Sequence, residues 1–414
     1  MACTKRLRSG AARRVAPAAA GAFLAVALAA CVGGPDGGTR VAREPVPATA
    51  PADTPSPDAP AVVAGSRIGT GSVKVALIVP LSGPGSAVGT AMRNAAELAI
   101  EDFQKPDLQI LVKDDRGSPE GAREAAQSAV ADGVELVLGP LFATNVQAAA
   151  TVIRSAGKPL IAFSTDAGVA ARGTYLLSFL PQAEVDRIVD ESVASGRKSF
   201  AAMIPETAYG NAVEAQFREA VARKGARLVA IERYPAGNPG AAVARLASLI
   251  TGPGAQADAL FLPDTPDGLG AAAAALAKAG FSPSRVRPIG TAVWSDPRVY
   301  ALPALQGGWY AAPDAAGFNG FAQRYQARFG SAPPRVATLA YDAVSLMSAL
   351  SRQYGSQRFA DTTLTNPSGF SGIDGTFRFR PDGPSDRALA IYEIRSGAPA
   401  VVSPAPRTLG PSGT

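Results

Sequence analysis

The stretch that decides the fold is Val73–Pro80, which reads VKVALIVP. It is a short apolar run rich in β-branched residues, as expected for a strand buried on both faces of a sheet. A turn rich in glycine and proline follows, and residues 88–103 then sort apolar and polar side chains onto opposite faces of a helix. This segment predicts the first strand and helix of an α/β domain.

The same alternation of strand and helix continues along the chain. A first run predicts strands at 108–112, 135–138 and 159–163, with helices at 119–131 and 145–156. A second run, beginning near Pro181, predicts helices at 184–194, 211–224, 240–250 and 267–279, with strands at 199–204, 227–233 and 257–262. Such alternation produces right-handed crossovers and parallel sheets. The predicted fold class is therefore α/β, with two Rossmann-like lobes and a ligand cleft at the carboxyl ends of their strands.

The first thirty residues resemble an export signal. Residues 1–30 contain five basic residues and no acidic residue, and an apolar run of small residues covers 16–30. The run ends in LAAC at 28–31, which resembles the lipobox of bacterial lipoproteins, where the signal is cut before a cysteine that carries lipid. We therefore expect 1–30 to be a signal peptide and Cys31 to be lipidated. Residues 31–71 are rich in Pro, Ala, Gly and Thr, and we expect a disordered tether there.

The composition excludes several classes of function. The signal contains five of the basic residues that give the chain its net charge of +6, so the remaining body is nearly neutral and indicates no nucleic-acid partner. The chain has no histidine and two cysteines, of which only Cys31 lies beyond the signal. Nucleophile systems that need an imidazole, and zinc sites built from His or Cys clusters, are therefore not expected. We predict that the protein is not an enzyme and has no metal or cofactor.

Several segments together resemble the type I periplasmic binding proteins of the leucine/isoleucine/valine-binding group. The likeness covers residues 73–395 and rests on the order and spacing of VPLSGP at 79–84, LGPL at 138–141, KPLIAFST at 158–165, AYG at 208–210, YDAV at 341–344 and GIDGTFRF at 372–379. The resemblance implies that the chain crosses three times between two lobes, and that these crossings form a hinge. It assigns 72–181 with 312–352 to lobe one, 182–311 with 353–396 to lobe two, and 397–414 to a C-terminal tail.

The resemblance also implies a function. The protein would present a small polar molecule, such as an amino acid or amide, to the permease of an ABC transporter. It would do so from a lipid anchor in the cell envelope, facing the periplasm. Val32 and Gly33 follow Cys31 without the acidic residue that retains some lipoproteins in the inner membrane, which favours the outer membrane.

Six ligand-contacting residues follow from the resemblance: Ser82, Thr144, Ser164, Thr165, Tyr209 and Trp294. The four hydroxyls of lobe one would hold a carboxylate of the ligand, since helix N-termini and exposed backbone N–H groups favour an anion. Tyr209 would cover the ligand from lobe two, and Trp294 would pack on a ring or an aliphatic part. The alternative is structural: each hydroxyl would cap a helix or stabilise a turn, and Trp294 would be a core or rim aromatic residue.

One segment departs from the pattern of amino-acid-binding members. These often present an acidic residue to the ligand's ammonium group in the loop after the strand that corresponds to 286–289. Here that loop reads GTAVW at 290–294. An unpaired buried ammonium would be costly, so Asp264 and Asp296 are considered as substitutes, although both fit turn or cap positions. Specificity for branched-chain amino acids therefore stays open.

Two other functions compete with solute binding. A dinucleotide enzyme is suggested by GPGSAVG at 83–89, which lies between a strand and a helix, with acidic residues at 114 and 115. Residues 80–82 lengthen its turn, however, and Pro84 removes an N–H that would face a phosphate. The second is a lipoprotein of the same fold that activates a penicillin-binding protein, contacting a peptidoglycan synthase. Such a protein would show an exposed apolar patch or an occluded cleft.

Overall fold

The structure is a computed structural model that describes residues 66–104 and 106–410. The predicted signal peptide, Cys31 and the tether up to residue 65 lie outside the described residues. Among the described helices, none combines the length and the hydropathy needed to cross a membrane.

The first sheet contains the strands predicted for lobe one. Its order is β1-β3-β2-β4-β5-β6, and every pair is parallel except β1 with β3. The strands are β1 (Arg67–Ile68), β2 (Val73–Val79), β3 (Leu108–Asp114), β4 (Leu136–Leu138), β5 (Leu160–Ala162) and β6 (Thr174–Leu176). The central strand β2 is buried along nearly its whole length, as its apolar sequence predicts.

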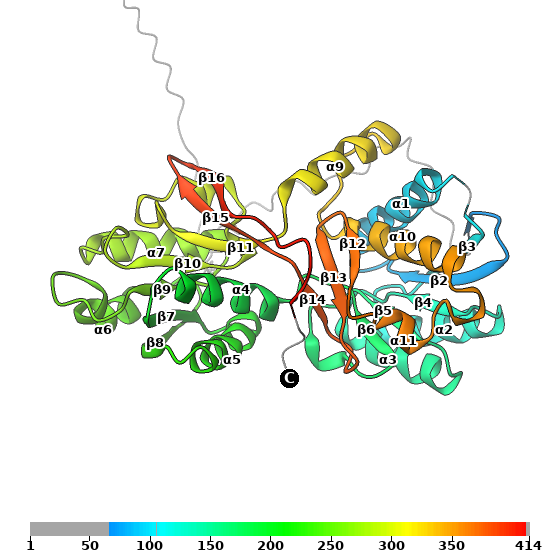
Figure 1. The fold of residues 1–414 in the computed structure, drawn as a ribbon, viewed down its shortest axis with the longest axis horizontal. Helices are drawn as coiled ribbons and strands as arrows, with labels where there is room; N and C mark the ends of the chain where they lie inside the picture. Colours follow the sequence, from blue (N-terminus) through cyan, green and yellow to red (C-terminus); the bar gives the residue numbers. More distant parts are fainter. Residues whose placement is uncertain (1–65, 105, 411–414) are drawn as a thin grey trace, which may run out of the picture. The chain divides into compact units, whose positions relative to one another are not determined.

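Helices cover both faces of this sheet. The connecting helices are α1 (Ser86–Asp102), α2 (Pro119–Ala131) and α3 (Ala143–Ser155). Val75 and Leu77 of β2 point into a core with α1 and with α10 (Ala337–Gln353), whereas Ala76 and Ile78 point into a core with α2 and α3. Figure 1 shows these two helix pairs on opposite sides of the sheet.

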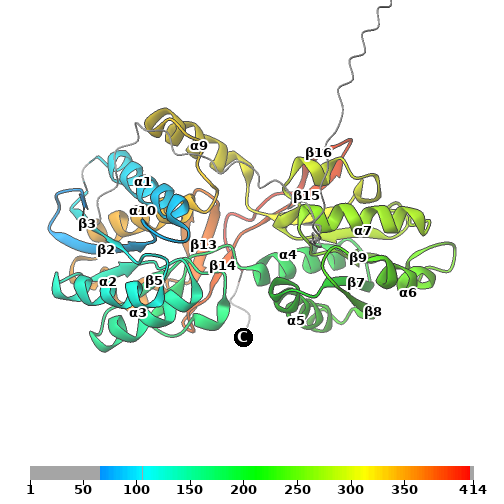
Figure 2. The same cartoon turned by 180° about the vertical axis from the view of Figure 1, so that it is seen from behind.

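The second sheet has the order β16-β15-β11-β10-β9-β7-β8. Its strands are β7 (Ser199–Pro205), β8 (Arg227–Tyr234), β9 (Ala259–Phe261), β10 (Arg287–Gly290), β11 (Trp309–Ala312), β15 (Ala390–Arg395) and β16 (Ala398–Ser403), of which the last two run antiparallel to their neighbours. α4 (Pro181–Ala194) and α5 (Ala208–Arg223) cover one face. α6 (Gly240–Ile250) and α7 (Pro266–Lys278) cover the other, and the short α8 (Pro297–Tyr300) follows β10. Figure 2 shows the same layers from behind.

The assignment of 353–396 to lobe two is wrong for most of that range. α9 (Ala315–Phe329), α10, α11 (Asp361–Leu364) and the sheet of β12 (Phe370–Gly372), β13 (Gly375–Phe379) and β14 (Ser385–Arg387) all contribute to the core of lobe one. Phe377 and Phe379 are fully buried in that core beside strand residues of β2. Lobe two receives β15 and β16 from this part of the chain.

The outer boundaries also differ from the prediction. Arg67 and Ile68 pair with β3, so the sheet of lobe one begins inside the range 31–71 that was expected to be tether. Residues 398–403 pair with β15, so the expected C-terminal tail of 397–414 contributes an edge strand to lobe two. Both strands bury backbone groups that a free tail would leave to water.

The chain passes between the two sheets three times. The first crossing is residues 177–180, between β6 and α4, and the second is residues 313–314, between β11 and α9. The third is residues 388–389, between β14 and β15, and not near residue 352 as predicted. The crossings are short, as expected for a hinge that joins two separately packed lobes.

Candidate ligand-binding site

The loop after β2 is held by a carboxylate of the neighbouring strand. Asp114 accepts hydrogen bonds from the N–H groups of Leu81 (2.8 Å), Ser82 (3.2 Å) and Arg116 (2.8 Å), and from the hydroxyl of Ser82 (2.6 Å). Burial opposes ionisation of Asp114, but these donors outweigh it and lower the pKa of the carboxyl. Ser82 is exposed, and its hydroxyl already has a partner in this conformation.

This contact also bears on the dinucleotide alternative. In a Rossmann site the glycine-rich turn leaves its N–H groups for a pyrophosphate, and an acid after the second strand binds ribose. Here Asp114 takes up the N–H groups of Leu81 and Ser82. Asp114, one of the two acids that suggested a dinucleotide site, is therefore bonded to the residues just before the glycine-rich turn.

Thr144 lies at the second position of α3 and not at its cap, because α3 begins at Ala143 after Phe142. Its side chain is exposed, and its hydroxyl is 3.4 Å from the Asn145 side-chain oxygen. Asn145 is fully buried and donates to Asp115 (3.0 Å), linking α3 to the end of β3. Burial raises the pKa of Asp115. Thr144 thus remains available at the carboxyl edge of the sheet, while its neighbour is structural.

The loop after β5 holds two further predicted residues in different environments. Ser164 is buried, and its hydroxyl accepts a hydrogen bond from the N–H of Asp166 (3.1 Å). Thr165 is exposed, and no hydrogen bond is recorded for its hydroxyl among the described residues. Ser164 therefore shapes the loop, and Thr165 is the free hydroxyl.

In lobe two, Tyr209 lies at the start of α5 and contacts the loop after β10. Its hydroxyl is 2.6 Å from the Thr291 hydroxyl, and Thr291 is fully buried. Thr207 begins the helix by accepting a hydrogen bond from the N–H of Gly210 (3.0 Å). Burial, together with the nearby charge of Glu184, raises the pKa of Tyr209. The phenol is therefore neutral at physiological pH and able to donate or accept a hydrogen bond.

Glu184 is a further residue of this group, which sequence reasoning missed. It lies in the first turn of α4 with 6% of its surface exposed, and Oε2 accepts from the N–H of Ala292 (2.9 Å). Burial raises its pKa to about 8, despite the hydrogen bond from Ala292 and the positive charge of Arg335. An acid in a first helical turn ordinarily stabilises the helix dipole, so its position alone gave no signal of contact with a loop more than a hundred residues away.

Trp294 is a core residue and does not reach a ligand. Its side chain is fully buried, Nε1 donates to the carbonyl of Leu262 (2.9 Å), and its ring lies 6.2 Å from that of Tyr310. A side chain on Gly290 would collide with the indole, so the two residues fit together closely. The expectation that Trp294 packs on a ligand is therefore wrong in this conformation.

The two acids considered as substitutes for the missing loop carboxylate are both occupied. Asp264 is buried and accepts from the hydroxyl of Tyr234 (2.7 Å) and the N–H of Thr265 (2.7 Å). Asp296 caps α8 and pairs with Arg298 (2.8 Å). Asp264 therefore stabilises a turn and Asp296 caps a helix, which were the structural roles considered for them in place of ligand binding.

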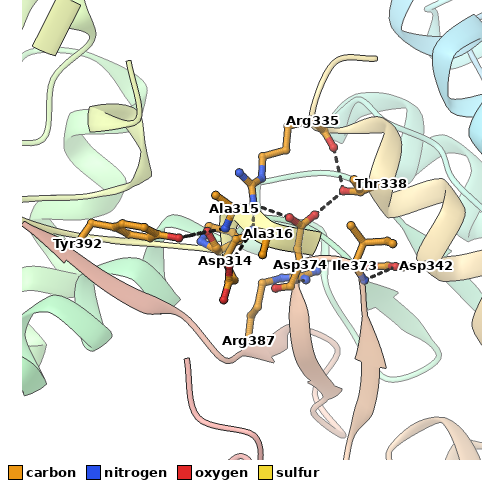
Figure 3. A network of polar contacts seen from close by, with 11 residues as sticks. Asp314, Ala315, Ala316, Arg335, Thr338, Asp342, Ile373, Asp374, Arg387 and Tyr392 are labelled. Carbon is orange, nitrogen blue, oxygen red and sulfur yellow. Dashed lines mark hydrogen bonds and ion pairs between the residues drawn. The ribbon is translucent and has the colours of Figure 1, made fainter. Parts of the chain in front are cut away.

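A partly buried polar network joins the three crossings, and Figure 3 shows it from close by. Arg335 donates to the Asp314 carbonyl of the second crossing (3.0 Å) and to Asp374 (2.5 Å). Arg387, just before the third crossing, is buried with its guanidinium 5.1 Å from the ring of Phe179 in the first. These contacts connect the crossings through side chains of lobe one. A change in the angle between the lobes must therefore be absorbed at these contacts.

A cavity of about 870 Å³ lies between α4, α5 and the hairpin of β13 and β14. Charged side chains dominate its lining, and they are largely paired with one another, as Asp186 is with Arg223 (2.7 Å). None of the six predicted ligand-contacting residues lines it. Among the described residues, no cluster of three or more His, Cys, Asp or Glu could hold a metal ion.

A family model for periplasmic binding proteins matches residues 72–399. The chain belongs to the periplasmic binding protein family. Members of this family are solute-binding proteins of transporters rather than enzymes, and the resemblance and fold class predicted from the sequence are confirmed. The family acts in the periplasm or elsewhere outside the cytoplasm.

Solved periplasmic binding proteins have the same fold. A putative branched-chain amino acid ABC transporter protein from Rhodospirillum rubrum aligns with a TM-score of 0.71 and 22% identity, over 80% of this chain and 99% of that one. A solute binding protein from Rhodopseudomonas palustris, in complex with 3,4-dihydroxybenzoic acid, gives a TM-score of 0.57 and 23% identity, over 80% and 96%. A branched-chain amino acid transporter substrate binding protein from Streptococcus pneumoniae, in complex with isoleucine, gives 0.54 and 21%, over 80% and 99%.

Two curated relatives match shorter parts of the chain. The Leu/Ile/Val-binding protein BraC3 of Rhizobium johnstonii is 32% identical over 75 residues, which is 17% of this chain and 20% of the relative. The leucine-, isoleucine-, valine-, threonine- and alanine-binding protein of Pseudomonas aeruginosa is 24% identical over 180 residues, or 40% of this chain and 48% of the relative. The chain therefore matches less than half the length of either relative.

Proposed function

We propose that this protein is an extracytoplasmic solute-binding lipoprotein that closes its two lobes on a small polar ligand, such as an amino acid or amide, and presents it to an ABC transporter. The observation that carries the proposal is the polar group at the strand ends of lobe two. There the Tyr209 and Thr291 hydroxyls lie 2.6 Å apart, and the buried Glu184 contacts the same loop. The relatives and solved structures named above, which bind amino acids or an aromatic acid, support the same class of ligand.

The two lobes would contribute different chemistry. Lobe one offers the exposed hydroxyls of Thr144, in the first turn of α3, and of Thr165, whereas the Ser82 hydroxyl would first have to leave Asp114. A helix N-terminus suits a carboxylate. Lobe two offers the Tyr209 phenol together with Glu184. A ligand with an anionic end and a polar or cationic end would satisfy both walls on closure, and water would be excluded from the charged groups.

A thermal-shift screen of the purified protein against amino acids, amides and aromatic acids tests the proposal. A ligand that binds the folded state at a hundredfold excess over Kd adds about 2.7 kcal/mol of stability, which is readily measured as a rise in Tm. No rise with any compound would contradict solute binding. If the protein then also captured a purified peptidoglycan synthase, activation of a penicillin-binding protein would replace solute binding as the proposed function.

The lipid anchor is part of the same proposal. Cys31 ends the apolar run of the signal, and its thiol is the group that a lipidating enzyme would modify. Cys31→Ser is expected to give an unprocessed or soluble protein in cell fractionation. Mature Cys31→Ser protein that still fractionates with the membrane would contradict the anchor.

A further inference from the structure

Glu184 has more hydrogen-bonding capacity than the protein uses. Its side chain is buried, and among the described residues the one hydrogen bond recorded for its carboxyl comes from the N–H of Ala292 to Oε2. No ion pair involving Glu184 is recorded among those residues. A buried carboxyl with one donor is costly to ionise unless a cation or further donors reach it.

The positive charge that acts on Glu184 is paired with other groups. Arg335 acts on Glu184 through its charge, but its guanidinium contacts Asp374 (2.5 Å) and the Asp314 carbonyl (3.0 Å) at the crossings. Tyr209, the buried Asp264 and the exposed Glu206 are other titratable groups near this edge, and none of them can supply a cation. Among the described residues, Glu184 is therefore left without a cation paired to its carboxyl.

The loop that contacts Glu184 is the one where the expected acid is absent. Residues 290–294 contain no carboxylate, yet Glu184 reaches the N–H of Ala292 in this loop from the first turn of α4. The carboxyl thus lies against the position that an acid of the loop would occupy. Thr291, beside it, is bonded to Tyr209, which holds the loop in place.

We propose that Glu184, contributed by α4, receives a protonated amine of the ligand, and that the protein therefore selects amine-bearing solutes over carboxylates that lack the amine. This inference rests on the proposed function and narrows its ligand class. The amine forms an ion pair and a hydrogen bond with the free carboxyl oxygen, which offsets the cost of burying both charges. Zwitterionic amino acids fit this arrangement, and benzoate-like acids do not.

The first test compares ligands on the unaltered protein by isothermal titration calorimetry. Leucine, isoleucine, phenylalanine and glutamine are titrated beside 4-methylpentanoate, benzoate and 3,4-dihydroxybenzoate, whose chains or rings are similar but which carry no amine. Amino acids are expected to bind at least about 30-fold more tightly than their amine-free counterparts, because only the amine gives the Glu184 carboxyl an ion pair and a further hydrogen bond. Tighter binding of the amine-free acids would overturn the inference and leave solute binding intact.

The second test uses two matched variants. Glu184→Gln keeps an oxygen for the Ala292 N–H but removes the charge, so amino-acid affinity should fall by about 30-fold or more while affinity for amine-free acids changes little. Glu206→Gln is the matched control. Glu206 is an exposed acid at the end of β7, three residues before Tyr209, and is therefore also the alternative residue that could receive the amine. Loss of amino-acid binding in Glu206→Gln, with Glu184→Gln unaffected, would overturn the assignment. Absence of binding by every compound to the unaltered protein would instead contradict the proposed function itself.

Discussion

Asp114 in lobe one and Glu184 in lobe two are both partly or fully withdrawn from water near the carboxyl end of a sheet, but their surroundings differ. Asp114 has four donors around it, three of them backbone N–H groups, and its pKa is lowered. Glu184 has one donor, and its pKa is raised to about 8. The balance between the depth of burial and the number of donors decides in which direction the pKa of a carboxyl moves. Asp114 is thus a structural clamp, whereas Glu184 has capacity left for a ligand.

The largest expected effect concerns the pH dependence of stability at Glu184. The folded carboxyl has a pKa of about 8, while the unfolded one has its ordinary value near 4.5, so the folded state binds more protons between these pH values. The free energy of unfolding therefore falls as pH rises through this window. Glu184→Gln removes this loss of stability. The variant's free energy of unfolding, measured relative to that of the unaltered protein, should therefore rise by on the order of 3 kcal/mol between pH 4.5 and pH 8.

Urea unfolding at pH 5 and pH 8 measures this difference. Glu206→Gln, at an exposed position, serves as the control and should show no such divergence. Parallel pH profiles for Glu184→Gln and the unaltered protein would mean that Glu184 is not held neutral, and the comparison with Asp114 would fail.

The next effect tests the clamp in lobe one. Asp114→Ala removes the acceptor for the N–H groups of Leu81, Ser82 and Arg116, and we expect a loss of about 2 kcal/mol in the free energy of unfolding, because water satisfies these partly exposed groups only in part. Asp267→Ala, which breaks an exposed ion pair with Arg298, is the control and should cost less than about 0.5 kcal/mol. Equal losses in the two variants would show that the loop does not depend on Asp114.

A smaller effect is expected from the hydroxyl pair of lobe two. Tyr209→Phe and Thr291→Val each remove one partner of the same hydrogen bond, so each should cost about 1 kcal/mol, and the double variant should cost less than the sum. Chemical unfolding of the three variants gives the coupling free energy. Additive losses would indicate that the two hydroxyls do not interact in solution.

The smallest effect separates two predicted binding residues. Ser82→Ala removes a hydroxyl bonded to Asp114 at an exposed position and should cost less than about 1 kcal/mol of stability. Thr165→Ala should leave stability unchanged, since no hydrogen bond of its hydroxyl is recorded among the described residues, yet it should weaken ligand binding. A thermal melt with and without ligand distinguishes the two. Destabilisation of the ligand-free protein by Thr165→Ala would contradict its assignment as a free hydroxyl.

Local signals predicted the regular elements well. α2 extends over the predicted residues because Pro119 starts it, and Ser118 caps it by accepting from the N–H of Gly121 (3.1 Å). The glycines at 196, 225, 252 and 280, each of which follows a helix of lobe two, all have left-handed backbone angles, as is typical after the last residue of a helix. These features depend on neighbours in sequence, which a single sequence displays directly.

The third crossing and Glu184 depend on distant neighbours and were missed for that reason. The apolar pattern of β13 is compatible with packing in either lobe. Only the three-dimensional structure shows that Phe377 and Phe379 pack in the core of lobe one. Glu184 meets Ala292 across more than a hundred residues, and in sequence it is an ordinary acid of a first helical turn. Trp294 was misjudged in the same way, because its burial depends on Gly290 and Leu262 together.

The most direct test of the central claim is a measurement of closure. With Cys3 and Cys31 changed to serine, spin labels on cysteines introduced at Gln127 of α2 and Ala274 of α7, both exposed, report the distance between the lobes by pulsed electron resonance. Saturating amino acid is expected to shorten and narrow the distance distribution. A distribution that does not change while calorimetry shows the ligand bound would contradict a hinged pair of lobes that closes on its solute.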